Sequence, residues 1–307
     1  AKGIYYLTNL GQVPTLTITG DVKTLAFDVP VYSLEISGAA KSVTAKSVTF
    51  LSAREFGSVS IAATKDSGAG LYARTFIETA GTGTTPMSIK ATGAVIEEVG
   101  STGAAAQPVK LLNVASKVYK DANKVSKTSL GAVGSLPKVV ADLANTAAPA
   151  SEATPSAIQG SVLKAVTVSG GPIVADELVG AIDKVTVAGG NLRAALIQST
   201  KDLVLVQATA KKGVGGAVGT AGKPTALAIK AQPNAKKTAI GKVSAQTGLS
   251  GYFYAGYVAE TGAAAHTGGI GTLQTKTGVV EGAAFLDPTL VSKMKVLPKG
   301  QTIPTNP

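Results

Sequence analysis

The chain of 307 residues contains no cysteine and no tryptophan, and it has a single histidine. Without cysteine it cannot form a disulfide, a thiolate metal site or a cysteine nucleophile. A zinc site would need three or four ligands, so the one histidine would have to be joined by an unusual set of carboxylates. No apolar run approaches the roughly 18–20 residues that a membrane-spanning helix requires. We therefore expect no metal, no cofactor and no membrane span.

The motifs of common enzyme classes are incomplete. The histidine, His266, lies in a segment rich in glycine and alanine, and no Gly-x-Ser-x-Gly nucleophile elbow accompanies it. A phosphate loop ending at Lys223 fails, because Pro224 stands where the motif needs a hydroxyl for Mg²⁺ and the continuation of a helix. The Gly-Ala-Gly segment at 68–70 matches part of a dinucleotide-binding consensus, but 72–79 reads as a strand in place of the required helix.

Adjacent carboxylates occur at Glu97–Glu98 and at Asp176–Glu177. Neighbouring residues of a strand point to opposite faces, so neither pair can form the two-carboxylate site of a glycoside hydrolase by itself. The sequence therefore predicts a protein that is not an enzyme.

The chain has 29 Lys and Arg against 18 Asp and Glu, a formal net charge of +11. Only Arg54, Arg74 and Arg193 are arginines, and the lysines are spread along the chain without a basic block. Recognition of bases and phosphates favours the bidentate arginine fork and several converging cations. Despite the charge, we expect no nucleic-acid partner.

A short strand phrase recurs along the chain. Apolar and polar residues alternate and end in glycine at 16–20 (LTITG) and at 34–38 (LEISG), a spacing of 18 residues. The phrase returns at 166–170 (VTVSG) and 185–189 (VTVAG), a spacing of 19 residues. Alternation of this kind is typical of half-buried strands. Less regular copies lie at 59–61, 89–93, 203–206, 227–231 and 240–244.

The length of the repeat selects among β folds. A strand–helix–strand crossover needs about 30 residues, whereas about 18–25 residues fit one coil of a β-solenoid. A hydrophobic content of 45% with only 5% aromatic residues suits a thin core of small aliphatic side chains, and the 36 glycines suit its corners. We expect an all-β fold, a β-solenoid (parallel β-helix) with short coils. The alternative is a set of antiparallel β-sandwich domains, which also have regularly spaced strands.

The phrases at 166–171 and 185–190, with the Gly, Ala, Thr and Val bias around them, resemble the coils of exported parallel β-helix proteins in adhesins, surface layers and extracellular filaments. The resemblance is to this class as a whole and covers about two thirds of the chain. It implies a secreted or cell-surface protein. The Gly-Gly pairs lack the spaced aspartate of the calcium-binding nonapeptide repeat.

The pattern changes between residues 107 and 160. Apolar residues from 111 to 125 recur at helical spacing, which predicts an amphipathic helix. Pro137 can begin a second short helix to residue 143, and 146–155 has the composition of a linker. The insertion could contact a neighbouring molecule or pack on its own coil. We therefore divide the chain into an N-terminal β part (1–106), a helical or linker insertion (107–160) and a C-terminal β part (161–307).

Aromatic residues are few but clustered, near residue 5 and between 252 and 257. On a strand, Tyr252 and Tyr254 would share one face and Phe253 would take the other. Tyrosine buries a large area at interfaces and keeps a polar tip. The candidates for a subunit interface, or alternatively for a layer that caps the end of the stack, are Tyr5, Tyr6, Tyr252, Phe253, Tyr254 and Tyr257.

These features predict a structural protein, a secreted subunit that forms a homopolymer such as a filament or a surface layer. Unpaired backbone at the end of a stack invites another strand, and head-to-tail contacts that do not close produce open filaments. The first residues are Ala-Lys-Gly, which we interpret as a chain whose leader has been removed on export. The alternative is a β-helix adhesin or spike that binds or cleaves a cell-surface glycan.

Overall fold

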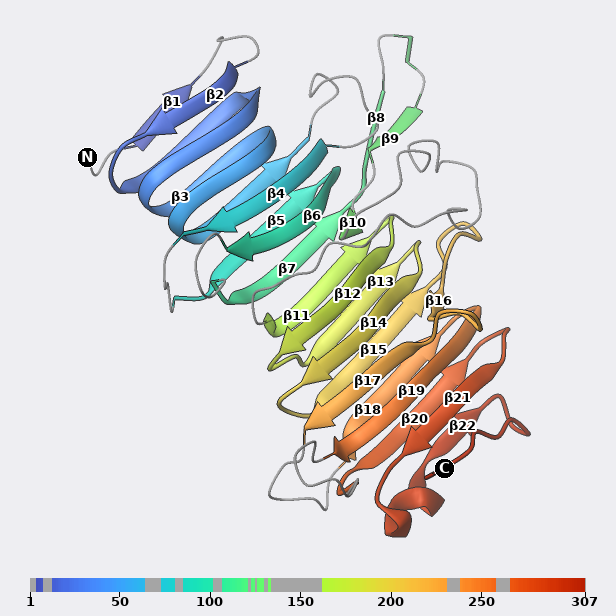
Figure 1. The fold of residues 1–307 in the computed structure, drawn as a ribbon. Helices are drawn as coiled ribbons and strands as arrows, with labels where there is room; N and C mark the ends of the chain where they lie inside the picture. Colours follow the sequence, from blue (N-terminus) through green and yellow to red (C-terminus); the bar gives the residue numbers. More distant parts are fainter. Residues whose placement is uncertain are drawn as a thin grey trace. The chain divides into compact units, whose positions relative to one another are not determined.

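The computed structural model describes residues 4–7, 13–63, 73–80, 85–101, 107–120, 123–124, 126–129, 132–133, 162–230, 238–257 and 266–306. Within these residues the chain is almost entirely β-strand (Figure 1), and the only helix is a short 3₁₀ segment, η2 (Pro288–Lys293). None of these residues forms a helix that is long and apolar enough to cross a membrane. The all-β fold expected from the sequence is confirmed.

Internal contacts divide the chain into two compact units, 1–161 with 168–171, and 162–167 with 172–307. In the first unit the parallel pairings form two series. One series runs β2–β3–β4–β6 and the other runs β1–β3–β5–β7, and the long strand β3 belongs to both. The strands of this unit are β1 (Ile4–Leu7), β2 (Val13–Ile18), β3 (Val22–Ala62), β4 (Ala73–Thr79), β5 (Met87–Thr92), β6 (Ala94–Ser101), β7 (Val109–Ala115), β8 (Lys117–Lys120), β9 (Ser126–Ser129) and β10 (Ala132–Val133).

The second unit repeats this arrangement. Its two parallel series run β12–β14–β17–β19–β21 and β13–β15–β18–β20–β22, and β16 pairs with β14 and β19. The strand β11 (Val162–Ser169) is divided between the two units. The remaining strands are β12 (Ile173–Gly180), β13 (Lys184–Ala188), β14 (Leu192–Ser199), β15 (Leu203–Thr209), β16 (Ala217–Val218), β17 (Thr225–Lys230), β18 (Thr238–Ala245), β19 (Gly248–Tyr257), β20 (Gly269–Thr275), β21 (Val280–Phe285) and β22 (Lys295–Leu297).

The recurrent phrases of the sequence stack on one another. Leu16 of the first phrase pairs with Leu34 of the second, and the pairing continues to Ile18 and Ile36. In the other pair of phrases the hydroxyls of Thr167 and Thr186 are 3.2 Å apart. Among the named strands that the structure describes, β8 and β9 alone pair antiparallel. Elsewhere among the described residues, antiparallel pairing is limited to two isolated bridges, Lys211–Val214 and Thr220–Lys223. Parallel pairing of the other named strands does not fit the antiparallel sandwich that the sequence left open.

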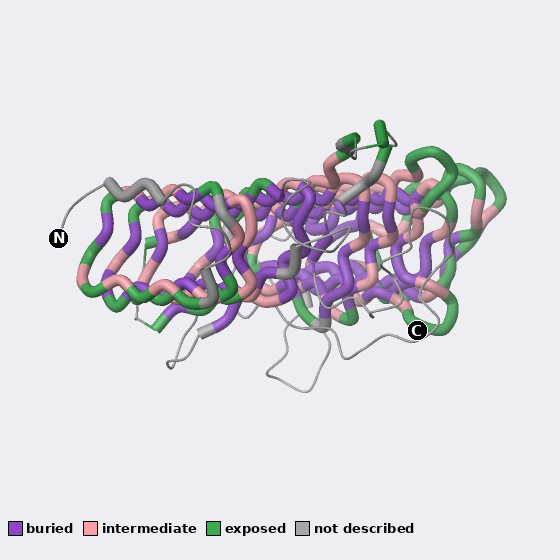
Figure 2. Tube along the Cα trace, turned by 90° about the horizontal axis from the view of Figure 1, so that it is seen from above, coloured by how far each residue is buried: buried purple, intermediate pink, exposed green. Residues whose placement is uncertain are grey.

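The core consists of small aliphatic side chains aligned from strand to strand. In the first unit Val59, Ile89 and Leu112 occupy one register position on three strands, and all three are buried. Figure 2 shows the buried stretches alternating with exposed ones along each turn. Burying one such side chain contributes roughly 1.5–3 kcal/mol. Larger rings are buried as well, Phe27 and Phe56 in the first unit and Phe253 in the second.

The helix expected over 111–125 is wrong where the structure describes the chain, because β7 and β8 occupy 109–115 and 117–120. Within β7 the buried residues Leu112 and Val114 alternate with Leu111 and Asn113, as in a regular strand. The exposed apolar side chain of Leu111 and the half-buried Ala115 lie on the other side of the strand, and these extra apolar positions imitate helical spacing. The expected helix from Pro137 and the linker at 146–155 lie outside the described residues.

The edge of β21 is covered by the chain's own residues 301–306. The Gln301 side chain accepts a hydrogen bond from the Val280 N–H (2.7 Å), and the Asn306 side chain accepts one from the Leu286 N–H (2.9 Å). Between them the Ala284 N–H donates to the Pro304 carbonyl (2.8 Å). Side-chain amides therefore satisfy backbone N–H groups that would otherwise be able to pair with another strand.

Close contact between turns predicts that Gly38 tolerates no side chain. A Cβ there would overlap the Gly20 backbone and lie 2.5 Å from Asp21 Oδ1. We expect Gly38→Ala to lower the free energy of unfolding by about 1–3 kcal/mol, measured by urea denaturation. The control is Gly222→Ala, since nothing lies within 4 Å of a Cβ at Gly222. Equal stability of the two variants would contradict the stacking of these turns.

Candidate interaction surface

An exposed row of aromatic rings crosses the first unit. Phe50 on β3 pairs in register with Phe76 on β4, and their rings are stacked with centroids 5.2 Å apart. Tyr32, on an earlier part of β3, meets Phe50 edge to face at 5.3 Å. Tyr32 is 59% exposed and Phe50 is 38% exposed. Single exposed apolar residues are ordinary, but a contiguous row marks an interaction site. We call Tyr32, Phe50 and Phe76 the aromatic ladder.

Carboxylates accompany the aromatic ladder on the same strand series. Glu98 on β6 pairs with Phe76 and so continues the row by one strand. Glu78 is exposed and lies two residues after Phe76, so it points to the same side of the sheet. Glu35 is exposed on β3 and pairs with Thr17 of β2, so it belongs to the same strand series. We call the aromatic ladder together with Glu35, Glu78 and Glu98 the acidic face.

The other strand series of this unit carries exposed lysines, two on β3 and one each on β5 and β7. None of these lysines forms an ion pair with another described residue. Asp28 on the same series is 3.8 Å from Lys46 and is therefore already paired. Leu111 on β7 is 38% exposed and adds apolar surface. We call Lys23, Lys41, Lys90 and Lys110 the lysine face.

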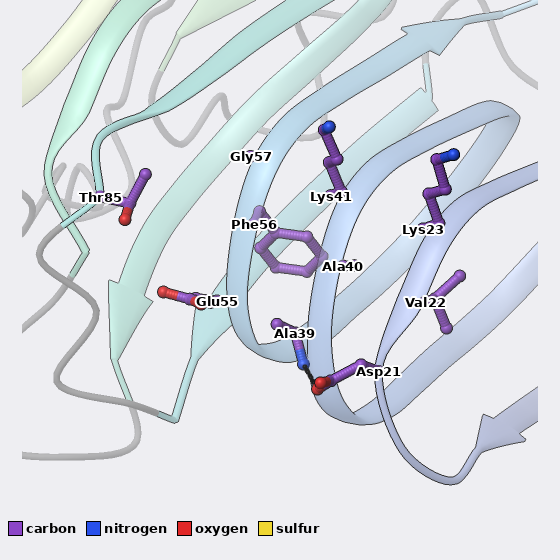
Figure 3. A pocket seen from close by; sticks show the side chains of 10 residues that line it. All are labelled: Asp21, Val22, Lys23, Ala39, Ala40, Lys41, Glu55, Phe56, Gly57 and Thr85. Atoms are coloured by element: carbon purple, nitrogen blue, oxygen red, sulfur yellow. Dashed lines mark hydrogen bonds between the residues drawn. The ribbon is translucent and has the colours of Figure 1, made fainter. Parts of the chain in front are cut away.

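A groove of about 320 Å³ crosses the turns of β3 (Figure 3). Lys23 and Lys41 stand along one side of it, and Asp21 and Glu55 lie toward the other. Asp21 Oδ1 accepts a hydrogen bond from the Ala39 N–H (2.9 Å), which fixes this carboxylate at the margin. The volume lies at the lower end of the range of small-ligand sites, about 300–1,000 Å³.

A buried amide holds the residues beneath the groove. Gln107 is 1% exposed, and its Oε1 accepts a hydrogen bond from the Phe56 N–H (2.8 Å). Its Nε2 donates to the carbonyls of Phe56 and Thr85, each at 2.6 Å. Phe56 and Thr85 both line the groove. Gln107 therefore fixes two segments of the groove that are far apart in sequence.

The predicted aromatic cluster on β19 is divided between surface and core. Tyr252 is 42% exposed whereas Phe253 is fully buried, as alternation along a strand predicts. The Tyr254 ring stacks on Phe285 of β21 with centroids 4.5 Å apart. The backbone of Tyr257 pairs with β17, and nothing is described of its side chain.

The other predicted pair, Tyr5 and Tyr6, lies on β1 of the first unit, where the backbones pair with Leu25 and Ala26 of β3. The two clusters thus belong to different units. Their role in a subunit interface stays a prediction, and the buried Phe253 ring is a core residue of its own unit.

His266 lies beside the stacked pair on β19 and β21. Its ring centroid is 5.4 Å from that of Phe285 and 6.3 Å from that of Tyr254. Burial lowers the pKa of this imidazole. Among the described residues, none makes a hydrogen bond to its buried Nδ1. A catalytic histidine is normally oriented by such a bond, and the described residues also contain no group of three or more potential metal ligands.

The adjacent carboxylates Glu97 and Glu98 face different ways, as expected. Glu97 is 3% exposed, while Glu98 is half-buried on the outer side. A register shift pairs Thr75 with Ile96 and Phe76 with Glu98, so Glu97 is the extra residue of a β-bulge. The pair therefore does not form a two-carboxylate site by itself.

The sequence alone predicted neither the aromatic ladder nor the contacts of Gln107. Tyr32 and Phe50 are 18 residues apart, the spacing of the phrases at 16–20 and 34–38, so the repeat could have aligned them. Phe76 follows after 26 residues, which breaks that period. Gln107 is 51 residues from Phe56, and no local pattern links the two.

No protein-family model, no curated protein and no solved structure matches the chain.

The burial difference between two phenylalanines on β3 predicts different losses of stability. Phe50→Ala removes two ring contacts at the surface, and we expect the free energy of unfolding to fall by about 1–2 kcal/mol. Phe56→Ala empties a core position that is 1% exposed, and we expect a loss of about 3–5 kcal/mol. Urea unfolding followed by circular dichroism measures both, and equal losses would contradict the surface position of Phe50.

Proposed function

We propose that the protein is a non-catalytic structural subunit, a β-solenoid that assembles with copies of itself into an extracellular filament or surface layer. In this interpretation the two strand series of each unit are the two sides of a flattened coil. The parallel pairing of strands at repeated offsets supports it, as does the stacking of like residues such as Leu16 on Leu34. An extracellular place agrees with the class of proteins that the repeats resemble.

The observation that carries this proposal is the aromatic ladder. Tyrosine and phenylalanine are enriched in protein interfaces relative to the rest of a surface. Tyr32 and Phe50 together expose a contiguous apolar strip on the outer side of a sheet. Covering such a strip contributes about 25 cal/mol per Å² of apolar area removed from water. A second molecule packed on this face is the simplest way to remove the apolar strip from water.

The covered edge of β21 favours contacts between outer faces. Gln301 and Asn306 already occupy backbone donors there, so another strand would have to displace them. Addition of a strand end to end at this edge is thereby disfavoured. The proposed assembly accordingly proceeds side by side, in contrast to the end-to-end route expected from the sequence.

The self-assembly proposal is tested by sedimentation and negative-stain microscopy of concentrated protein. We expect ordered filaments or sheets from the wild type, and a rise of about tenfold or more in the critical concentration of Tyr32→Ser/Phe50→Ser, because the apolar cover is lost. The matched control is Val204→Ser/Val279→Ser, which removes two residues that are 52% and 54% exposed elsewhere. Uniformly monomeric wild-type particles at every concentration would refute the proposal.

The groove favours a second candidate function, binding of an acidic cell-surface glycan. The ammonium groups of Lys23 and Lys41 could bind a sugar carboxylate, while Asp21 and Glu55 could accept hydrogen bonds from sugar hydroxyls. Lys23 and Lys41 have no ion-pair partner among the described residues.

A glycan array tests this second function. We expect Lys23→Ala/Lys41→Ala to reduce retention on uronic-acid glycans by about tenfold or more, since charge-assisted bonds are lost. Lys184→Ala/Lys295→Ala is the control, because both lysines are exposed in the second unit. Release of reducing ends would show cleavage in addition to binding. Retention of the wild type at background level on every glycan would exclude the groove as a glycan site.

A further inference from the structure

We propose that the acidic face of one copy packs against the lysine face of the next copy. This inference rests on the proposed self-assembly and specifies the contact that drives it. It concerns the first unit, which carries both faces on its two strand series.

The charges of the two faces are opposite and unpaired within the described chain. Glu35, Glu78 and Glu98 form no salt bridge with another described residue, and neither do the four lysines. Two acidic faces brought together would oppose carboxylate to carboxylate, which strongly disfavours that pairing. When an acidic face meets a lysine face, carboxylates lie against ammonium groups. Charge therefore favours a heterologous contact, in which two different faces meet.

The apolar parts of the two faces also match. The aromatic ladder leaves Tyr32 and Phe50 exposed, and the lysine series leaves Leu111 exposed. Lysine side chains can lay their methylene stems across apolar surface and place the ammonium group over an aromatic ring. The ladder can therefore be covered by the same lysines that neutralise the flanking carboxylates.

The spacing of the strands is the same on both faces, because both consist of hydrogen-bonded parallel strands about 4.8 Å apart. Phe50, Phe76 and Glu98 form one row across the strands of the acidic face. Ser60, Lys90 and Asn113 form a row across the strands of the lysine face. Rows of equal spacing can remain in register over several strands.

The contact does not close on itself. In the proposed coil the two faces lie on opposite outer sides, so each copy offers one acidic and one lysine face. A heterologous contact of this kind adds one copy after another in an open series.

Charge reversal tests the contact directly. One variant, Glu35→Lys/Glu78→Lys, reverses two of the three charges of the acidic face, and a second, Lys90→Glu/Lys110→Glu, reverses two of the four charges of the lysine face. All four positions are exposed, and none of them lines the groove. We expect each variant alone to show a critical concentration for sedimentable assembly raised about tenfold or more. An equimolar mixture should restore assembly, because alternating copies then set the reversed charges of one face against the reversed charges of the other.

Matched controls reverse the same number of charges elsewhere. Glu177→Lys/Glu281→Lys and Lys184→Glu/Lys295→Glu change exposed residues of the second unit and should assemble like the wild type. Circular dichroism and urea unfolding of every variant confirm that the fold is retained.

The outcomes separate this inference from the proposed function. If the wild type assembles and either face variant assembles equally well, the contact is overturned while self-assembly stands. If both variants fail and their mixture also fails, the pairing of these two faces is overturned. If the wild type itself never assembles, the contact and the proposed function fall together.

Discussion

Parallel hydrogen bonding between the strands of each series is the constraint on which the rest of this structure depends. It places each side chain beside the equivalent side chain of the next strand in the series. Inside, the result is columns such as Ile197, Leu227 and Phe253, which are all fully buried. Ala284 follows Phe253 in that column, and its small size leaves room for the ring. A few residue types with compatible volumes are therefore enough to fill a long core.

The same constraint turns single residues of the outer surface into rows. A row of rings stabilises itself, as Phe50 on Phe76 does at 5.2 Å. A row of like charges repels itself and needs counter-charges. The chain supplies some of these internally, with Arg54 3.3 Å from Asp21 and Lys46 3.8 Å from Asp28. The charges of the acidic and lysine faces have no such partner among the described residues, which is why a second copy is their proposed complement.

Irregularities in the strand pairing determine where the groove lies and how the edge of β21 is covered. Bulges at Glu97 and Lys110 shift the register by one residue, and several side-chain amides replace backbone partners. Gln107 fixes Phe56 and Thr85 under the groove. Gln301 and Asn306 occupy the edge of β21. These irregularities thus position the groove and direct the proposed association to the outer faces.

The sequence by itself determined the all-β fold and the stacking of its repeats, because strand alternation and an 18- or 19-residue spacing are local properties of the chain. It also predicted that Tyr252 and Phe253 point to opposite sides. Only the tertiary structure decided that 109–115 is a strand, since apolar residues on its outer side, such as Leu111, imitate helical spacing. It alone added Phe76 to the pair Tyr32 and Phe50, and joined Gln107 to Phe56, because the connections to Phe76 and Gln107 differ in length from the repeat and no sequence period records them.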